Sequence, residues 1–312
     1  MIIFNSLDEI KNIQPCIVAL GNFDGIHLGH QGIIKKAVAD AREDGVKSAI
    51  FTFSNHPRNL VEGEKGIKNI LYQEDKQRIV ESLGVDYYFN LPFDSIMMKM
   101  SPEDFIDKIL IDILNAKGIM CGFNYNFGYK GKGNVELLIK QGSEKDFSVH
   151  VAKPFTVDGE VVSSSLIREN ITIGNMKKCR ALLGRYYSIG GEVVVGNRLG
   201  KTIGFPTSNL NIDDGMASPP NGVYRTLCIY NNVVYPSITN VGRKPTIGEY
   251  CKNIETHIFN FDKELYGKNI RVEFIEKMRD EVKFDSIERL SEAIRRDCNE
   301  AKKKHEEEGR IL

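Results

Sequence analysis

Apolar runs alternate with amphipathic stretches through the first half of the chain. Strands are predicted by the apolar runs, at Cys16–Leu20, Ser48–Phe53, Asp86–Phe89, Gly118–Cys121 and Ser148–Lys153. Helices are predicted between them, at Gln31–Arg42, Tyr72–Leu83, Ser101–Asn115 and Asn134–Lys145. Strands that alternate with helices are typical of a parallel sheet with helices on both faces. We therefore expect an α/β fold in this part of the chain.

The pattern changes near Gly184. Short β-rich runs follow, separated by turns rich in Gly, Asn, Pro and Asp, at Ser188–Val195, Gly222–Tyr230, Val233–Val241, Ile254–Phe261 and Ile270–Lys277. This pattern predicts an antiparallel sheet or barrel. A last amphipathic helix is expected at Ser286–His305, with Ile287, Leu290, Ile294 and Cys298 on its core-facing side. We expect two domains, at residues 1–184 and 185–312.

Composition narrows the class of protein. The chain has 42 basic and 42 acidic residues, so its formal net charge is zero and no general nucleic-acid footprint is expected. Six cysteines are scattered without a Cys-x-x-Cys pair, which disfavours a zinc ribbon or a dithiol site. Because no secretion signal or long apolar run is visible, we expect a cytoplasmic protein without a membrane partner.

The segment Gly21–His30 carries the strongest chemical signal. It lies between a predicted buried strand and a predicted helix, so backbone N–H groups converge there on a site for an anion. His27 and His30 are three residues apart near the helix start and can reach one ligand. Gly29 between them allows a large group to approach the backbone. The alternative is a pair of half-exposed helix histidines.

Three more segments follow predicted strands and are expected at the same carboxyl edge of the sheet: Phe53–Arg58, Gly122–Gly128 and Ser163–Arg168. Serine hydroxyls and an arginine suit phosphate groups. Each segment keeps an alternative. His56 can be a strand-end histidine bonded to backbone, Asn124 a plain turn residue, and the serines a simple helix cap.

A second glycine-rich segment lies in the β-rich half. Gly196, Gly200 and Gly204 recur at a spacing of four and form a loop able to wrap phosphates, although it is not a Walker loop. Thr207 and Asn209 follow, two residues apart, and face the same side of an extended segment. Their neutral oxygens can share Mg²⁺ with substrate phosphates.

These segments resemble one family, the bacterial bifunctional riboflavin kinase/FMN adenylyltransferases, also called FAD synthetases. The resemblance rests on the Gly-Asn-Phe-Asp-Gly-x-His-x-Gly-His turn, the His-Pro, Phe-Gly and Ser-Ser-x-x-Ile-Arg segments, and Pro-Thr-Ser-Asn, where Ser208 replaces the usual alanine. It implies a Rossmann-like nucleotidyltransferase domain with a parallel sheet. It also implies an antiparallel β-barrel riboflavin kinase domain that ends in a helix.

The resemblance also implies the site residues. In the first domain, ATP would be bound by Gly21, Asn22, Phe23, Asp24, His27, Gly29, His30, Ser164 and Arg168, with His27 and His30 catalytic. In the second domain, ATP would be bound by Gly196, Gly200, Gly204, Thr207 and Asn209, the last two with Mg²⁺. Flavin would contact His56, Asn124, Phe127 and Arg279.

Further pieces match the kinase module, at Pro220–Tyr224, Thr239–Thr246, Ile254–His257, Leu265–Gly267 and Met278–Glu281. By this resemblance Glu255 is the general base that accepts the hydroxyl proton of riboflavin. The alternative for Glu255 is an exposed strand charge, and for Arg279 a solvated charge cluster. His257 shares the side-chain parity of Glu255, and we expect a structural role for it.

The chain departs from the family pattern at Asn55, Asn126 and Gly131, while Lys130 and Lys132 lie near two of these positions. A rival hypothesis is therefore a monofunctional riboflavin kinase whose first domain only binds flavin or has a structural role. A second rival is a nucleotidyltransferase acting on another acceptor, such as a pantetheine or nicotinamide mononucleotide. A third is nucleic-acid binding by the barrel, which zero net charge disfavours.

The preferred hypothesis is a cytoplasmic enzyme that uses Mg²⁺ and ATP to convert riboflavin to FMN, and FMN to FAD with release of pyrophosphate. Its expected partners are these small molecules, without nucleic acid or membrane. We expect a monomer or a weak homo-oligomer.

Overall fold

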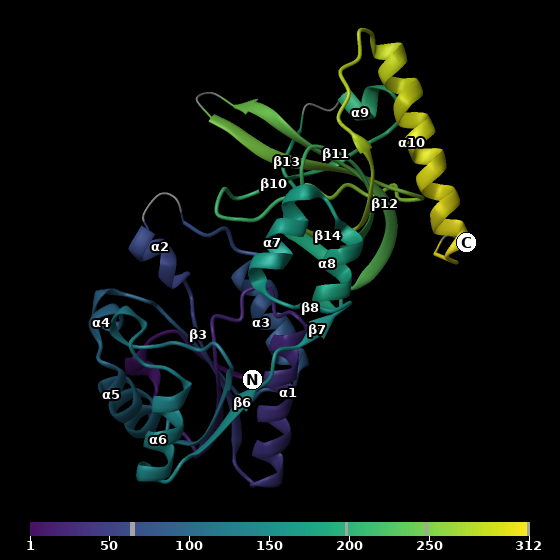
Figure 1. Ribbon diagram of the computed structural model, residues 1–312. Coiled ribbons are helices and arrows are strands. Elements are labelled where there is room, and N and C mark those ends of the chain that lie inside the picture. The colour runs from purple at the N-terminus through teal and green to yellow at the C-terminus, as the bar shows by residue number, and fades with distance from the viewer. Residues whose placement is uncertain (63–65, 197–198, 247–248, 311–312) are drawn as a thin grey trace. The chain divides into compact units, whose positions relative to one another are not determined.

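The computed structural model describes residues 1–62, 66–196, 199–246 and 249–310. The chain divides into two compact units, Met1–Ser164 and Ser165–Leu312. Figure 1 shows the elements of both units, and each unit is described by itself below. None of the helices in the described ranges is long and apolar enough to cross a membrane.

The first unit is built on a parallel sheet of six strands in the order β1-β4-β3-β2-β5-β6. The strands are β1 (Ile2–Phe4), β2 (Cys16–Leu20), β3 (Lys47–Phe53), β4 (Tyr87–Leu91), β5 (Ala116–Gly122) and β6 (Ser148–Ala152). A small antiparallel pair follows, β7 (Thr156–Val157) and β8 (Glu160–Val161). The predicted α/β fold with a parallel sheet is confirmed.

The helices of this unit cover both faces of the sheet. They are α1 (Leu28–Glu43), α2 (Pro57–Glu62), α3 (Gln73–Ser82), α4 (Ser95–Lys99), α5 (Pro102–Asp104), η3 (Phe105–Ile113) and α6 (Val135–Lys145). Short 3₁₀ turns are η1 (Leu7–Glu9) and η4 (Tyr129–Gly131). Figure 1 shows α1 on one side of the sheet and α5 and α6 on the other.

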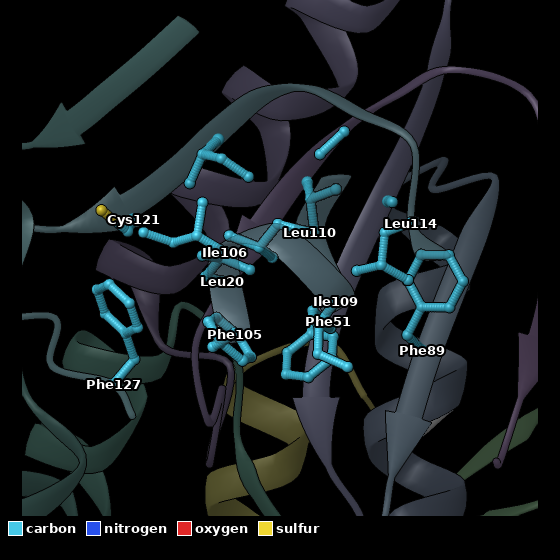
Figure 2. Packing of buried hydrophobic residues seen from close by; sticks show 14 of the residues in the cluster. Leu20, Phe51, Phe89, Phe105, Ile106, Ile109, Leu110, Leu114, Cys121 and Phe127 are labelled. Carbon is cyan, nitrogen blue, oxygen red and sulfur yellow. The ribbon is translucent and has the colours of Figure 1, made fainter. Parts of the chain in front are cut away.

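Two hydrophobic clusters, one on each face, hold this arrangement together. One joins α1 and α3 to the sheet through side chains such as Ile34 and Val80. The other joins η3 and α6 to the opposite face, and in Figure 2 the rings of Phe51 and Phe105 lie among its aliphatic side chains. Every residue of β2 is buried, because this strand lies inside the sheet between β3 and β5.

The segment predicted as one helix at 101–115 is a short α-helix followed by a π-helix. Ser101 caps it as expected, since its Oγ accepts a hydrogen bond from the Asp104 N–H at 3.0 Å. From Phe105 the helix has π-type hydrogen bonds. The Leu114 N–H, for example, donates to the Ile109 carbonyl five residues earlier at 2.9 Å. The apolar spacing that predicts an α-helix does not separate it from this wider form.

The second unit is an antiparallel sheet of six strands in the order β10-β13-β12-β11-β14-β9. The strands are β9 (Tyr187–Glu192), β10 (Ser208–Asn211), β11 (Gly222–Tyr230), β12 (Val233–Thr246), β13 (Glu249–Ile258) and β14 (Asn269–Asp280). An isolated bridge between Val194 and Asn209 links its two edges, so the sheet is a nearly closed barrel. The helices are α7 (Ser164–Ile173, with its first residue in the first unit), α8 (Met176–Leu183), α9 (Leu199–Thr202) and α10 (Ile287–Glu307).

A chain of hydroxyl groups runs across one face of three central strands. The Thr226 hydroxyl lies 2.8 Å from Ser237 Oγ and 2.8 Å from Thr239 Oγ1, which lies 2.9 Å from Thr256 Oγ1. All four side chains are fully buried, so the hydroxyl groups serve as hydrogen-bond partners for one another in place of water. The opposite face of the same strands carries the candidate kinase residues.

Helix α10 begins after Ser286, whose side chain accepts a hydrogen bond from the Arg289 N–H at 3.3 Å. Cys298 is buried and Ile294 is partly buried against the barrel, as predicted. The prediction for Ile287 was wrong, because its side chain is 57% exposed. The buried positions of α10 begin only at Ala293, so its first two turns have no core to cover Ile287.

Candidate active sites

The turn between β2 and α1 brings the two predicted histidines together. His27 is the N-cap of α1, and its Nδ1 accepts a hydrogen bond from the His30 N–H at 3.2 Å. Since Nδ1 accepts, the neutral His27 ring carries its proton on Nε2. The two rings are stacked, with centroids 3.6 Å apart.

The electrostatics around His30 favour a neutral ring. Burial lowers the pKa of His30 well below its ordinary value, and the nearby His27 and Lys76 lower it further. His30 Nδ1 is buried and has no hydrogen-bond partner among the described residues. The start of α1 and the two imidazole rings therefore offer N–H donors to an anion.

The turn itself is strained and is held by its surroundings. Phe23 and Ile26 have positive φ angles of 47° and 35°, and their side chains are buried. Such conformations cost on the order of 1–3 kcal/mol each. Asp24 supports the turn, because its Oδ1 accepts from the Ile70 N–H at 2.9 Å and its carbonyl accepts from Ser164 Oγ at 2.8 Å.

Two of the predicted glycines permit close packing in this turn. A Cβ built on Gly21 would lie 3.1 Å from the Phe23 ring, and one on Gly29 would lie 3.3 Å from the His27 ring. The structure therefore gives both glycines a packing reason. It is compatible with the predicted approach of a ligand to Gly29.

A pocket beside the turn brings together two of the predicted segments. It is lined by Asn22, Asp24, Phe53, Asn55, His56, Asn69, Leu71, Gln73 and Lys76. His56 thus shares a pocket with Asn22, while its Nδ1 also accepts a hydrogen bond from the Arg58 N–H at 3.3 Å. That contact matches the alternative of a backbone-bonded histidine.

The structure adds Lys76 to this pocket, which the sequence did not single out. The signal was present, because Lys76, Ile79 and Val80 recur at helical spacing and are the buried residues of α3. A lysine inside an apolar stripe is more informative than one on a solvated face.

The Phe-Gly segment after β5 places its two predicted flavin residues differently. Asn124 is exposed, and its carbonyl accepts a hydrogen bond from Asn126 Nδ2 at 3.0 Å. Phe127 is buried in the core beside Phe105, as Figure 2 shows. Its position favours a supporting role beneath the turn. Arg168 lies on α7 in the second unit.

In the barrel, three polar residues lie in one row across neighbouring strands. Glu255 on β13 is directly opposite Asn209 on β10 and Asn240 on β12. Opposed residues of antiparallel strands project from the same face, so the carboxylate lies between two amides. Asn240 was part of a matched motif, but no role was predicted for it.

The glycine loop packs closely onto this row. A Cβ on Gly196 would lie 2.5 Å from Asn209 Nδ2, and one on Gly200 would clash with the Phe205 carbonyl. Gly204 has a φ of 86° and open space around it. Residues 197 and 198 of the predicted loop lie outside the described residues, as do residues 247 and 248 after the Thr239–Thr246 motif.

Asn209 is ordered by its neighbours. Its Oδ1 accepts from Asn253 Nδ2 at 3.3 Å, and its Nδ2 donates to the Thr207 carbonyl at 3.4 Å. An amide oxygen is a neutral acceptor of the kind that Mg²⁺ prefers. Among the described residues, no group of three or more His, Cys, Asp or Glu side chains is placed to hold a metal ion.

His257 holds the segment that leads into β10. Its Nδ1 lies 2.8 Å from the Pro206 carbonyl, and its ring packs edge-to-face against Phe205 and Phe259. Burial lowers the pKa of His257, while the bond to Pro206 raises it to a smaller extent. These contacts support the structural role predicted for this residue.

Arg279 is held by α10. Its guanidinium binds both carboxylate oxygens of Asp297, with distances of 3.1 Å from Nε to each oxygen and 2.6 Å from Nη2 to Oδ2. It also lies 6.0 Å from the centre of the Phe284 ring. This pairing partly buries the guanidinium, and the flavin role of Arg279 stays a prediction.

The two units are those of a two-domain transferase, with one candidate site at the turn on the parallel sheet and another at the polar row on the antiparallel barrel. A family model described as FAD synthetase matches residues 9–166, and one described as Riboflavin kinase matches residues 183–305. The chain belongs to the bifunctional riboflavin kinase/FMN adenylyltransferase family.

Relatives of this name are similar along almost the whole chain. The protein from Bacillus subtilis is 36% identical over 91% of both chains. The protein from Haemophilus influenzae is 32% identical over 93% of this chain and 94% of its own. A crystal structure named as a macrolide-efflux protein from Streptococcus pneumoniae has a TM-score of 0.86 and 31% identity, and covers 96% of this chain and 98% of that one.

The predicted boundary between residues 184 and 185 stays a prediction. The compact units divide after Ser164, whereas the second family match begins at residue 183. The segment from residue 165 to residue 183 contains most of α7 and all of α8, and it belongs to the second unit.

Proposed function

We propose that Glu255 carries the kinase reaction and that His27 and His30 carry the adenylyl transfer. The enzyme phosphorylates riboflavin to FMN with ATP, and then converts FMN and ATP to FAD and pyrophosphate. The observation that carries the assignment is that each unit has a polar cluster of its own. The stacked histidines lie on one unit and the Asn209–Glu255–Asn240 row on the other.

In the kinase reaction, the primary hydroxyl oxygen of riboflavin attacks the γ-phosphorus of ATP. The bond between that phosphorus and the bridging oxygen breaks, ADP leaves, and Glu255 accepts the hydroxyl proton. A carboxylate fixed on a strand between two amides is held in place for this transfer, which depends mainly on positioning.

Magnesium fits the oxygens near Glu255. We infer that the Thr207 hydroxyl and Asn209 Oδ1 hold Mg²⁺ together with the ATP phosphates, because Mg²⁺ prefers oxygen ligands and commonly takes few from the protein. The ion would neutralise charge on the transferring phosphoryl group. Gly196, Gly200 and Gly204 would then pass close to the nucleotide.

In the adenylyl transfer, a phosphate oxygen of FMN attacks the α-phosphorus of ATP and pyrophosphate leaves. Negative charge grows on the phosphoryl oxygens, and the ring N–H groups of His27 and His30 stabilise it with the start of α1. Gly21, Asn22, Phe23, Asp24 and Gly29 shape this site, and Ser164 is proposed at the pyrophosphate end. The role that the family resemblance gives to Arg168 stays a prediction. No covalent intermediate is required.

The remaining assignments belong to the same proposal. His56, Asn124 and Phe127 are proposed on the flavin side of the first unit, with Phe127 acting from the core, and Arg279 on the flavin side of the second unit. We also propose a cytoplasmic enzyme that is a monomer or a weak homo-oligomer, with small-molecule partners and neither nucleic acid nor membrane. The zero net charge and the five described free cysteines, all buried, are consistent with this.

The test is an HPLC time course of the purified protein with riboflavin, ATP and Mg²⁺. We expect FMN to appear first and FAD to follow. FMN alone, even with FMN added in excess, would favour the rival monofunctional kinase. A product formed instead from a pantetheine or nicotinamide mononucleotide would favour the rival acceptor.

A further inference from the structure

A buried lysine lies beneath the histidine turn of the first unit. Lys76 projects from the apolar side of α3 and is only 5% exposed. Lysine is rarely buried to this extent, because removing an ammonium group from water costs several kcal/mol or more unless charge or hydrogen bonds compensate. The groups around Lys76 must therefore compensate for the water that its ammonium group has lost.

The ammonium group is directed to the ends of β2 and β3. Lys76 Nζ donates to the Asn22 carbonyl at 2.8 Å and to Thr52 Oγ1 at 2.8 Å. The Thr52 hydroxyl in turn donates to the same Asn22 carbonyl at 3.0 Å. Lys76 thus fixes the residue at which the chain leaves β2 and enters the turn.

Lys76 is also within electrostatic reach of the ligand site. It lines the pocket that Asn22, Asp24 and His56 share. Its charge contributes to the lowered pKa of His30. The positive charge therefore acts on the same space as the two histidines, where ATP phosphates are proposed to bind.

The hydrogen bonds of this charge are made to neutral groups. Its hydrogen-bond acceptors are a carbonyl and a hydroxyl, and burial lowers the pKa of Lys76 to about 8, partly offset by attraction to Asp24. A neutral side chain would serve a purely structural link at lower cost. A polyanion in the pocket would supply the missing compensation.

We propose that Lys76 is a positioning residue of the adenylyl-transfer site, which fixes the Asn22 carbonyl and supplies positive charge beneath the phosphates of ATP. This inference rests on the proposed function of the first unit. It extends the site from the turn to α3, an element outside the motifs that the sequence singled out.

The test compares full-length Lys76→Met with Thr52→Val and Lys36→Met. Lys76→Met removes the charge and the donors, Thr52→Val removes the shared hydroxyl and keeps the charge, and Lys36→Met removes a half-exposed surface lysine of α1. FMN adenylylation is measured against ATP concentration. Riboflavin phosphorylation by the same samples reports on the other unit, and thermal unfolding reports on folding.

We expect Lys76→Met to lower kcat/KM for ATP in adenylylation by at least about tenfold, mainly through KM, because a charge that attracts ATP also stabilises the bound ground state. Thr52→Val should lose less, and Lys36→Met should match the wild type. Kinase activity should be retained in all three. In histidine NMR titrations, Lys76→Met should raise the pKa of His30, which faces His27 at the N-cap of α1 and Lys76 on α3.

A folded Lys76→Met protein with wild-type kcat/KM for ATP would overturn the proposal, as would equal losses in Lys76→Met and Thr52→Val. Lys76→Gln, which keeps a donor without the charge, replaces the methionine variant if that one does not fold. If neither variant folds, the lysine serves stability and the proposal is also overturned. Absence of adenylylation in the wild type would instead contradict the proposed function itself.

Discussion

His27 and His30 depend on each other for their geometry. The His30 N–H fixes the tautomer of His27, and the two rings stack with their centroids 3.6 Å apart. Glu255 is fixed in a different way, by strand register between two asparagines. At the residue scale, the two sites therefore differ in chemistry. One presents N–H donors to an anion, and the other presents an acceptor to a hydroxyl.

Replacing His30 with alanine should abolish FAD formation and spare FMN formation. The loss of one positioned donor to a developing phosphoryl charge is expected to cost about 10²–10³ in adenylylation rate. Separate assays with riboflavin and with FMN measure the two steps. A folded variant that lost both activities to a similar extent would contradict the separation of the sites.

Replacing Glu255 with glutamine should stop FMN formation, while added FMN is still converted to FAD. The amide keeps the shape of the side chain but accepts no proton, and general-base catalysis commonly contributes 10²–10⁴. The measurement is the rate of riboflavin phosphorylation at saturating MgATP. Near-normal turnover would rule out Glu255 as the base.

At the scale of elements, the sequence predicted the strands and helices whose burial follows a simple period. Strands β2 and β3 were found because their apolar runs are buried on both faces. The short elements β1, α2, α4 and β10 were not, since three to six residues carry too little periodicity. The exposure of Ile287 depends on where the barrel ends beneath α10, which no local pattern contains.

In the candidate sites, too, local motifs were predictable and contacts between distant elements were not. The residues of both glycine-rich segments were predictable because each follows a motif along the chain. Lys76 and Asn240 were not, because their importance comes from neighbours on other elements. Lys76 reaches Asn22 from 54 positions away, and Asn240 meets Glu255 only through strand register.

The glycine loop of the barrel offers a test at this scale. Gly196→Ala should lower riboflavin kinase activity and leave FMN adenylylation intact, because the new Cβ would displace the Asn209 amide that lies 2.5 Å away. Gly191→Ala in the same unit is the matched control, since its Cβ would meet only Leu210 at 3.9 Å. Equal kinase activity in the two variants would show that the close approach is unimportant.

At the scale of the whole molecule, both units hide histidines that resist protonation. Burial is the main cause of the lowered pKa of His30, His257 and His305. Once unfolded, these side chains take up protons near pH 6.5. The unfolded state then binds more protons than the folded state below that pH, so the free energy of unfolding should fall as the pH is lowered.

Thermal unfolding at pH 7.5 and pH 5.5 measures this linkage. Tm should be lower at pH 5.5, by roughly 2–4 °C for each kcal/mol lost in a chain of this size. His257→Asn keeps a donor for the Pro206 carbonyl without a titrating ring, and its Tm should fall less between the two pH values. An equal or higher Tm at pH 5.5 in the wild type would contradict the role of the buried histidines.

The central claim is that two separate constellations carry the two reactions, and mixing two inactive variants tests it most directly. With riboflavin, ATP and Mg²⁺, His30→Ala alone should accumulate FMN, and Glu255→Gln alone should form neither product. We expect a mixture of the two proteins to form FAD, because the FMN that His30→Ala releases is adenylylated by Glu255→Gln. A mixture of folded variants that makes no FAD, or either variant making FAD from riboflavin alone, would contradict it.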